Sequence, residues 1–141
     1  MKKLKSILLI LVFSSFFFGF THVDKRHIGK WQYNEDGEVG TFIFQENGYA
    51  LMIMDGDTLG GESYLIDGEE YSLKYSVLYT KDPYYITFTM YFKNSGIRVS
   101  TMKGIFKYNE NGDMVICLDS EEGPRPTSFR KDDTATLKKI K

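Results

Sequence analysis

The chain of 141 residues contains one cysteine, two histidines and one tryptophan, and these scarcities exclude several kinds of protein. A single cysteine permits no disulfide within the chain, so packing alone must hold the fold. Cys117 lies in a continuous apolar run, residues 114–118. This position predicts a buried thiol that acts as a small hydrophobic group. A disulfide between two chains through Cys117 is an alternative if its strand lies at a sheet edge.

No convincing catalytic set or metal site is visible in the sequence. The only histidines, His22 and His27, lie near the N-terminus, so a nucleophile elsewhere has no evident basic partner. Residues 55–57 (Asp-Gly-Asp) are similar to the start of a calcium loop. However, Leu59 and Ile66 occupy the positions of the third carboxylate and the bidentate glutamate. We therefore predict a turn here, no bound metal, no cofactor and no enzymatic activity.

The N-terminus has the layout of a secretory signal. Lys2, Lys3 and Lys5 precede residues 6–20, which carry no charge and are mostly Ile, Leu, Val and Phe. This pattern predicts an N-terminal signal helix over residues 1–21, removed on export to the periplasm or the extracellular space. The alternative is an uncleaved anchor, but the apolar stretch is shorter than the ~20 residues that a spanning helix needs. We expect no stable membrane anchor after cleavage.

Cleavage changes the charge of the protein. It discards three lysines and leaves 15 basic against 19 acidic residues, a net charge of −4. A surface of this sign repels phosphate backbones, so nucleic acid is not an expected partner. Residues 22–141 fit one domain with a real core.

Beyond the leader, short strands alternate with tight turns. Asx-Gly pairs supply the positive φ angles of tight hairpins. They occur at residues 36–37, 47–48 and 67–68. A longer loop is expected over residues 55–61. Residues 71–79 and 84–92 show the longest period-two alternation, which is typical of half-buried antiparallel strands.

The pattern predicts an all-β domain. About eight strands joined mostly by hairpins, without the spacing of parallel units, favour an antiparallel up-and-down barrel. A flattened β-sandwich is the alternative. Closure into a barrel removes the exposed edges that an open sheet presents.

Two parts of the chain resemble a known family. Residues 29–31 (Gly-Lys-Trp) are similar to the Gly-x-Trp start of lipocalins. The C-terminal part resembles a group of small exported bacterial lipocalin-like proteins. The segments that carry this second resemblance are Gly104-Ile105-Phe106, residues 112–117 (Gly-Asp-Met-Val-Ile-Cys), residues 125–129 (Arg-Pro-Thr-Ser-Phe) and residues 137–140 (Leu-Lys-Lys-Ile). The resemblance implies a lipocalin-like barrel.

The same resemblance implies how the barrel is closed. Gly29 lets the backbone pass close beneath Trp31, which plugs one end. Relatives often carry an arginine on the last strand, where this chain has only lysines. A capping arginine must then come from Arg125 or Arg130, stacked on the indole. All four residues would have structural roles.

The aromatic residues give the best functional lead. The candidate lining residues of the barrel are Tyr33, Phe42, Phe44, Tyr75, Val77, Phe88 and Met90. They suit an amphipathic ligand, although rings of this size can also fill a barrel of about eight strands by themselves. An enclosed apolar volume of about 300 Å³ or more would indicate a ligand pocket. Tyr85 and Tyr91, on the outer face, are alternative contacts for a protein or glycan.

The resulting functional prediction is an exported lipocalin-like binding module for a small hydrophobic or amphipathic molecule. The alternative is a non-catalytic structural or protein-interaction domain whose barrel is filled by side chains. An enzyme comes third, and the oligomeric state is not predicted.

Overall fold

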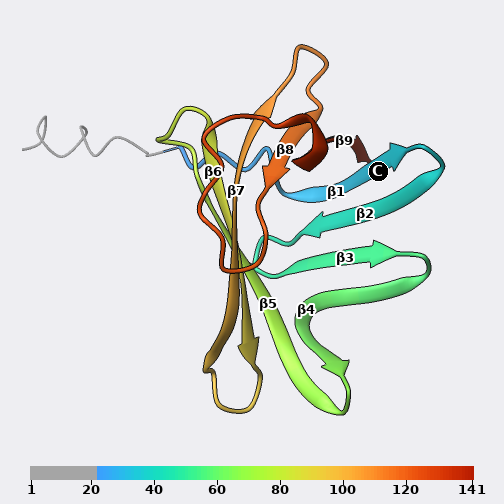
Figure 1. Ribbon diagram of the computed structural model, residues 1–141, viewed down its shortest axis with the longest axis vertical. Coiled ribbons are helices and arrows are strands. Elements are labelled where there is room, and N and C mark those ends of the chain that lie inside the picture. The colour runs from blue at the N-terminus through green and yellow to red at the C-terminus, as the bar shows by residue number, and fades with distance from the viewer. Residues whose placement is uncertain (1–21) are drawn as a thin grey trace, which may run out of the picture.

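The computed structural model describes residues 22–141, in which nine strands form one closed barrel. The strands are β1 (Gly29–Glu35), β2 (Glu38–Phe44), β3 (Ala50–Met54), β4 (Asp57–Ile66), β5 (Glu69–Leu78), β6 (Tyr84–Phe92), β7 (Arg98–Tyr108), β8 (Met114–Leu118) and β9 (Thr134–Ile140). Each strand pairs antiparallel with the next, and β9 pairs with β1 to close the barrel (Figure 1). A short 3₁₀ helix, η2 (Lys131–Asp133), precedes β9.

The predicted antiparallel all-β barrel is therefore confirmed, with nine strands instead of about eight. Closure of the sheet excludes the flattened sandwich. The predicted signal helix over residues 1–21 lies outside the described residues. Over residues 22–141, no helix is long and apolar enough to cross a membrane.

The hairpins follow from Asp-Gly pairs. Asp36, Asp55 and Asp67 have φ angles of 52°, 52° and 50°, and the glycine after each also has a positive φ. Two successive residues with positive φ make the two-residue turn that matches the twist of paired strands. The loop expected over residues 55–61 is consequently wrong. Only residues 55–56 turn, and β4 begins at Asp57.

Strand β4 bends sharply at two glycines. Gly60 and Gly61 have φ angles of 102° and 84°. The strand pairs with β3 up to Gly60, and its register with β5 shifts between Gly61 and Tyr64. A side chain at position 60 would place its Cβ 2.3 Å from the Ala50 carbonyl oxygen. The two glycines therefore let β4 turn from one wall of the barrel to the other, as Figure 1 shows.

Alternation along the strands separates the barrel interior from its outer face. The buried cluster contains Trp31, Phe44, Ala50, Ile86, Phe88, Phe106, Met114, Ile116 and Leu137. Strands β5, β6 and β7 have 10, 9 and 11 residues and extend well past β8, which has five. We call the two ends of the barrel the Trp31 end (with Tyr79, Tyr84 and Tyr108) and the Met90 end (with Tyr64, Tyr71 and Phe92).

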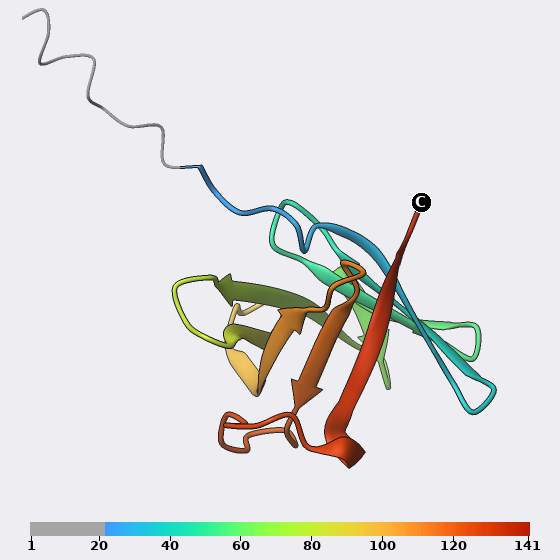
Figure 2. The ribbon, with the colours of Figure 1, turned by 90° about the horizontal axis from the view of Figure 1, so that it is seen from above.

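The segment between β8 and β9, residues 119–133, covers part of the outer face. Figure 2 shows it outside β7 and β8. Asp119 N donates to Lys103 O, and Ile105 lines a small hollow together with the buried Pro126. Ile105 is paired with Cys117, which is fully buried and free. The prediction of a buried thiol is confirmed, and β8 is not an edge strand because it pairs on both sides.

Candidate functional site

Trp31 lies at the centre of a packed barrel end. Its side chain is 1% exposed, and Nε1 donates to the carbonyl oxygen of His27 at 2.8 Å. The ammonium nitrogen of Lys139 lies 5.3 Å from the centroid of the indole ring. Because β9 pairs with β1, Lys139 stands directly opposite Trp31. The cation beside the indole thus comes from the last strand.

The prediction that Arg125 or Arg130 stacks on Trp31 is wrong. Arg125 lies over the ring of Tyr85, 4.2 Å from its centroid, and donates to Ile86 O at 2.8 Å. Arg130 forms ion pairs with two carboxylates of its own segment. Both arginines belong to residues 119–133, which lie on the outer face, whereas Trp31 points into the barrel. Arg125 therefore anchors this segment to β6 and β7.

Gly29 makes room for Lys139, which occupies the position beside the indole that was predicted for an arginine. Its φ is 128°, and a Cβ at this position would lie 3.1 Å from Cε of Lys139. A residue with a side chain would be strained here and would also crowd the lysine. Gly29 thus lets the Lys139 side chain approach the indole.

A network of hydroxyl groups surrounds Trp31. His27 Nδ1 lies 3.0 Å from the Tyr79 hydroxyl, which lies 2.7 Å from the Tyr108 hydroxyl. Burial raises the pKa of Tyr108. Burial also lowers the pKa of His27, so the neutral imidazole is favoured. No local sequence pattern predicts this contact, because His27 precedes the first strand and the tyrosines lie far along the chain.

Arg26 belongs to the same N-terminal segment as His27 and completes the packing around Trp31. Its guanidinium lies 4.5 Å from the ring centroid of Tyr108, and its Nε and Nη2 donate to Oδ1 and Oδ2 of Asp24. Each polar group of the Trp31 end named here has a partner in the protein. The contacts of this end are those of a packed, stabilising plug.

The seven predicted lining residues all lie on the inner face of the barrel, in two groups that share Phe88. Phe44 is in ring contact with Tyr75 and Phe88, at centroid distances of 5.1 and 6.1 Å. Tyr33, Phe42 and Val77 pack against the same buried cluster. These contacts fill the interior toward the Trp31 end. Only Phe88 and Met90 line an apolar pocket.

That pocket lies toward the Met90 end and has a volume of about 220 Å³. Its lining comes from β3 to β7 and from the segment after β8: Met52, Leu59, Tyr64, Ile66, Leu73, Phe88, Met90, Ser100, Met102 and Glu121. Leu59 and Ile66 are 49% and 38% exposed, so the pocket opens to solvent at these residues. It is smaller and less enclosed than the roughly 300 Å³ expected of a ligand cavity.

Several lining residues were missed from the sequence. Leu73 and Met102 belong to strands whose alternation places them on the inner face, so a signal was present. Leu59 was assigned to a loop that does not exist. Glu121 had no signal, because its position depends on how residues 119–133 fold back over the barrel.

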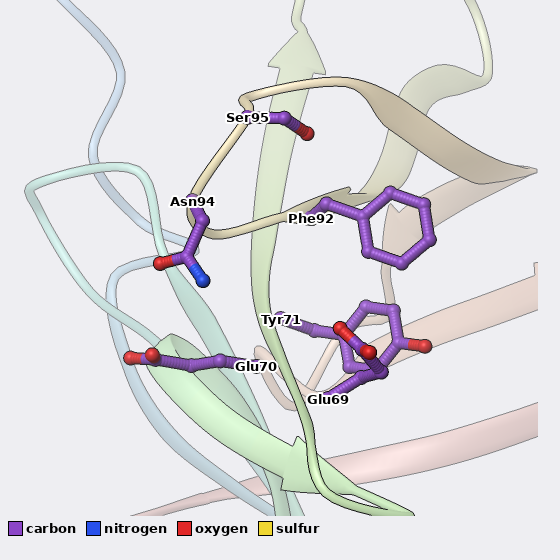
Figure 3. Close-up of a pocket in the computed structure, with 6 residues that line it drawn as sticks. All are labelled: Glu69, Glu70, Tyr71, Phe92, Asn94 and Ser95. Atoms are coloured by element: carbon purple, nitrogen blue, oxygen red, sulfur yellow. The ribbon is translucent and has the colours of Figure 1, made fainter.

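A second hollow, of about 510 Å³, adjoins the pocket at the hairpin tips. It is lined by Glu69, Glu70, Tyr71, Phe92, Asn94 and Ser95 (Figure 3). The rings of Tyr71 and Phe92 are stacked with centroids 5.3 Å apart, and Tyr71 also contacts Tyr64 of the apolar pocket at 5.9 Å. Aromatic surface thus continues from one hollow into the other.

Within residues 22–141, no group of three or more histidine, cysteine, aspartate or glutamate side chains is arranged to hold a metal ion. Comparison of the chain with protein-family models, curated proteins and solved structures gave no match. The lipocalin resemblance therefore rests on the sequence motifs alone.

Proposed function

We propose that the protein is an exported, lipocalin-like binding module for a small hydrophobic or amphipathic molecule. The observation that carries this proposal is the apolar pocket at the Met90 end, lined mainly by side chains without polar groups. Binding sites for small molecules are concave and mostly apolar, with few polar groups that fix orientation.

Methionines support this function. Met52, Met90 and Met102 come from three different strands and meet around the pocket. Unbranched thioether side chains adapt to irregular shapes, which suits a surface that must close around a ligand. The hydroxyls of Tyr64 and Ser100 supply the polar contacts of an amphipathic molecule.

The alternative, a structural or protein-interaction domain with a filled barrel, is supported by the other half of the interior. The rings of Phe44, Tyr75 and Phe88 are already in contact there, so side chains fill this part of the interior. Under this alternative, the pocket would bind nothing specifically.

Two matched substitutions on β3 test the proposal. Met52 lines the pocket, whereas Met54, two residues later, is 48% exposed and outside the lining. An indole introduced by Met52→Trp fills the pocket, so we expect the affinity for 1-octanol to fall by at least about tenfold. Met54→Trp adds the same ring outside the pocket and should leave the affinity unchanged.

Binding is measured by native mass spectrometry and by competition with a polarity-sensitive dye. Saturable binding of one octanol, lost in Met52→Trp and kept in Met54→Trp, supports the proposal. No saturable binding by the folded wild-type protein overturns it and favours the filled barrel.

A further inference from the structure

We propose that the pocket selects cationic amphiphiles, molecules that join a short apolar chain or ring to an ammonium group. This inference rests on the proposed binding function and names the class of ligand. The apolar part would occupy the pocket beside Leu73 and Met90, and the positive head would lie in the second hollow at Glu69, Tyr71 and Phe92.

The two hollows are consecutive along one face of the sheet. Leu73 pairs with Met90, and Tyr71 pairs with Phe92 one inward-facing position further along. Inward-facing neighbours on a strand are separated by about 7 Å, two residues of strand rise. A ligand with a chain of a few carbons therefore spans the distance from the methionines to the tip of the β5–β6 pair.

The hollow at the tip has the groups that bind ammonium ions. The stacked rings of Tyr71 and Phe92 present aromatic surface, and Figure 3 shows Glu69 beside Tyr71. Cations are attracted to aromatic faces by the ring quadrupole, and a neighbouring carboxylate adds a direct charge interaction. An alcohol would gain little from either group, and a carboxylate ligand would be repelled.

The charges around the pocket opening also favour a cationic ligand. Among the described residues, Glu69 and Glu121 form no ion pair or side-chain hydrogen bond, and Glu121 is the single charged residue of the apolar lining. The basic residues nearby are already paired. Lys93 lies 3.5 Å from Glu62, and Arg98 lies 2.7 Å from Glu122. The negative charge at the opening is therefore not neutralised by the protein.

Three ligands with the same chain test the inference: octyltrimethylammonium, 1-octanol and octanoate. We expect the ammonium to bind about tenfold more tightly than octanoate, with octanol between them. The preference should shrink between about 0.02 M and 0.2 M salt, because exposed charges are screened. Affinities are measured by isothermal titration below the concentration at which each compound forms micelles.

Substitutions locate the head group. Glu69→Gln should reduce the preference for the ammonium over octanol by about threefold to tenfold. Glu121→Gln should have a smaller effect in the same direction. Glu110→Gln removes an equal charge from the turn between β7 and β8, at the Trp31 end, and serves as the control. Circular dichroism verifies that each variant is folded.

The outcomes separate the two proposals. If octanol binds but the ammonium binds no better than octanoate, the charge selection is overturned and the binding module stands. If the preference exists but survives Glu69→Gln and Glu121→Gln, its assignment to these carboxylates is overturned. If none of the three ligands binds, the proposed function itself fails.

Discussion

The Trp31 end and the Met90 end of the barrel share the long strands β5, β6 and β7 but differ in how their polar and charged groups are bonded. At the Trp31 end, the indole of Trp31 is 1% exposed and is held by a hydrogen bond and by Lys139, beside the bonded hydroxyls of Tyr79 and Tyr108. At the Met90 end, methionines surround space, and two carboxylates have no charged partner among the described residues. The contrast teaches that one alternating pattern can give a rigid plug at one end and an adaptable opening at the other. Substitutions that affect only one end test this division.

The largest expected effect is at the plug. Trp31→Ala removes a buried ring and its hydrogen bond, which should lower the free energy of unfolding by about 3–5 kcal/mol. Denaturant unfolding measures the change. Met90→Ala, at the partly exposed pocket, should cost clearly less. Equal costs for the two variants would contradict the contrast between the ends.

The next effect is at the bend of β4, which connects the walls of the Met90 end. Gly60→Ala adds a Cβ 2.3 Å from a backbone oxygen at a φ of 102°. We expect a loss of about 2–3 kcal/mol from strain and crowding together. Gly56→Ala has a φ of 83° but nothing within 4 Å, so it isolates the conformational cost and should lose only about 1 kcal/mol. Similar thermal midpoints for the two variants would show that the close approach to Ala50 is not important.

His27, at the Trp31 end, should make the free energy of unfolding depend on pH. Burial lowers the pKa of His27 in the folded protein, against a raising effect of Asp24 and a lowering effect of Lys139. The unfolded chain therefore binds the proton more readily, and this contribution to stability is complete above about pH 6.5 and is lost as the pH falls. Unfolding measured between pH 7 and pH 5 should show a shallower decline in His27→Gln than in the wild type.

The same substitution at the exposed His22, His22→Gln, is the matched control for the change of side chain. A decline that is identical in His27→Gln and the wild type would place the titrating group elsewhere.

The smallest effect concerns the lysine beside the indole. Lys139→Gln removes a cation over Trp31 and a bond to Arg26 O, and should cost about 0.5–1 kcal/mol. Trp31 fluorescence should change in this variant, because the charge near the ring is lost. Arg125→Gln should leave the emission unaltered, since Arg125 contacts Tyr85 on the outer face. A fluorescence change in Arg125→Gln alone would reverse this assignment.

The fold was predictable where it depends on local pattern. Period-two alternation over residues 71–79 and 84–92 identified the faces of β5 and β6, and Asp-Gly pairs marked the hairpins. The loop expected over residues 55–61 included residues 57–61, which belong to β4. The sequence does not reveal that Gly60 and Gly61 continue a bent strand, because the same residues also suit a loop.

The site was less predictable, because it depends on packing between distant strands. Inward orientation was predictable for Phe44 and Met90 alike, but only the three-dimensional packing decides that one fills the barrel and the other lines a pocket. The capping cation was misassigned for the same reason. Lys139 reaches Trp31 through the pairing of the first and last strands, which no local pattern encodes.

The cover formed by residues 119–133 gives the protein a thiol that reports on local opening. Cys117 is fully buried beneath the outer face, and no other cysteine competes for a reagent. Reaction with a thiol reagent requires the cover to lift or the barrel to unfold. When reclosing is faster than the chemistry, the labelling rate therefore gives the free energy of the easier of these two motions. Comparison of that value with the global stability would show whether the cover moves as an independent cooperative unit.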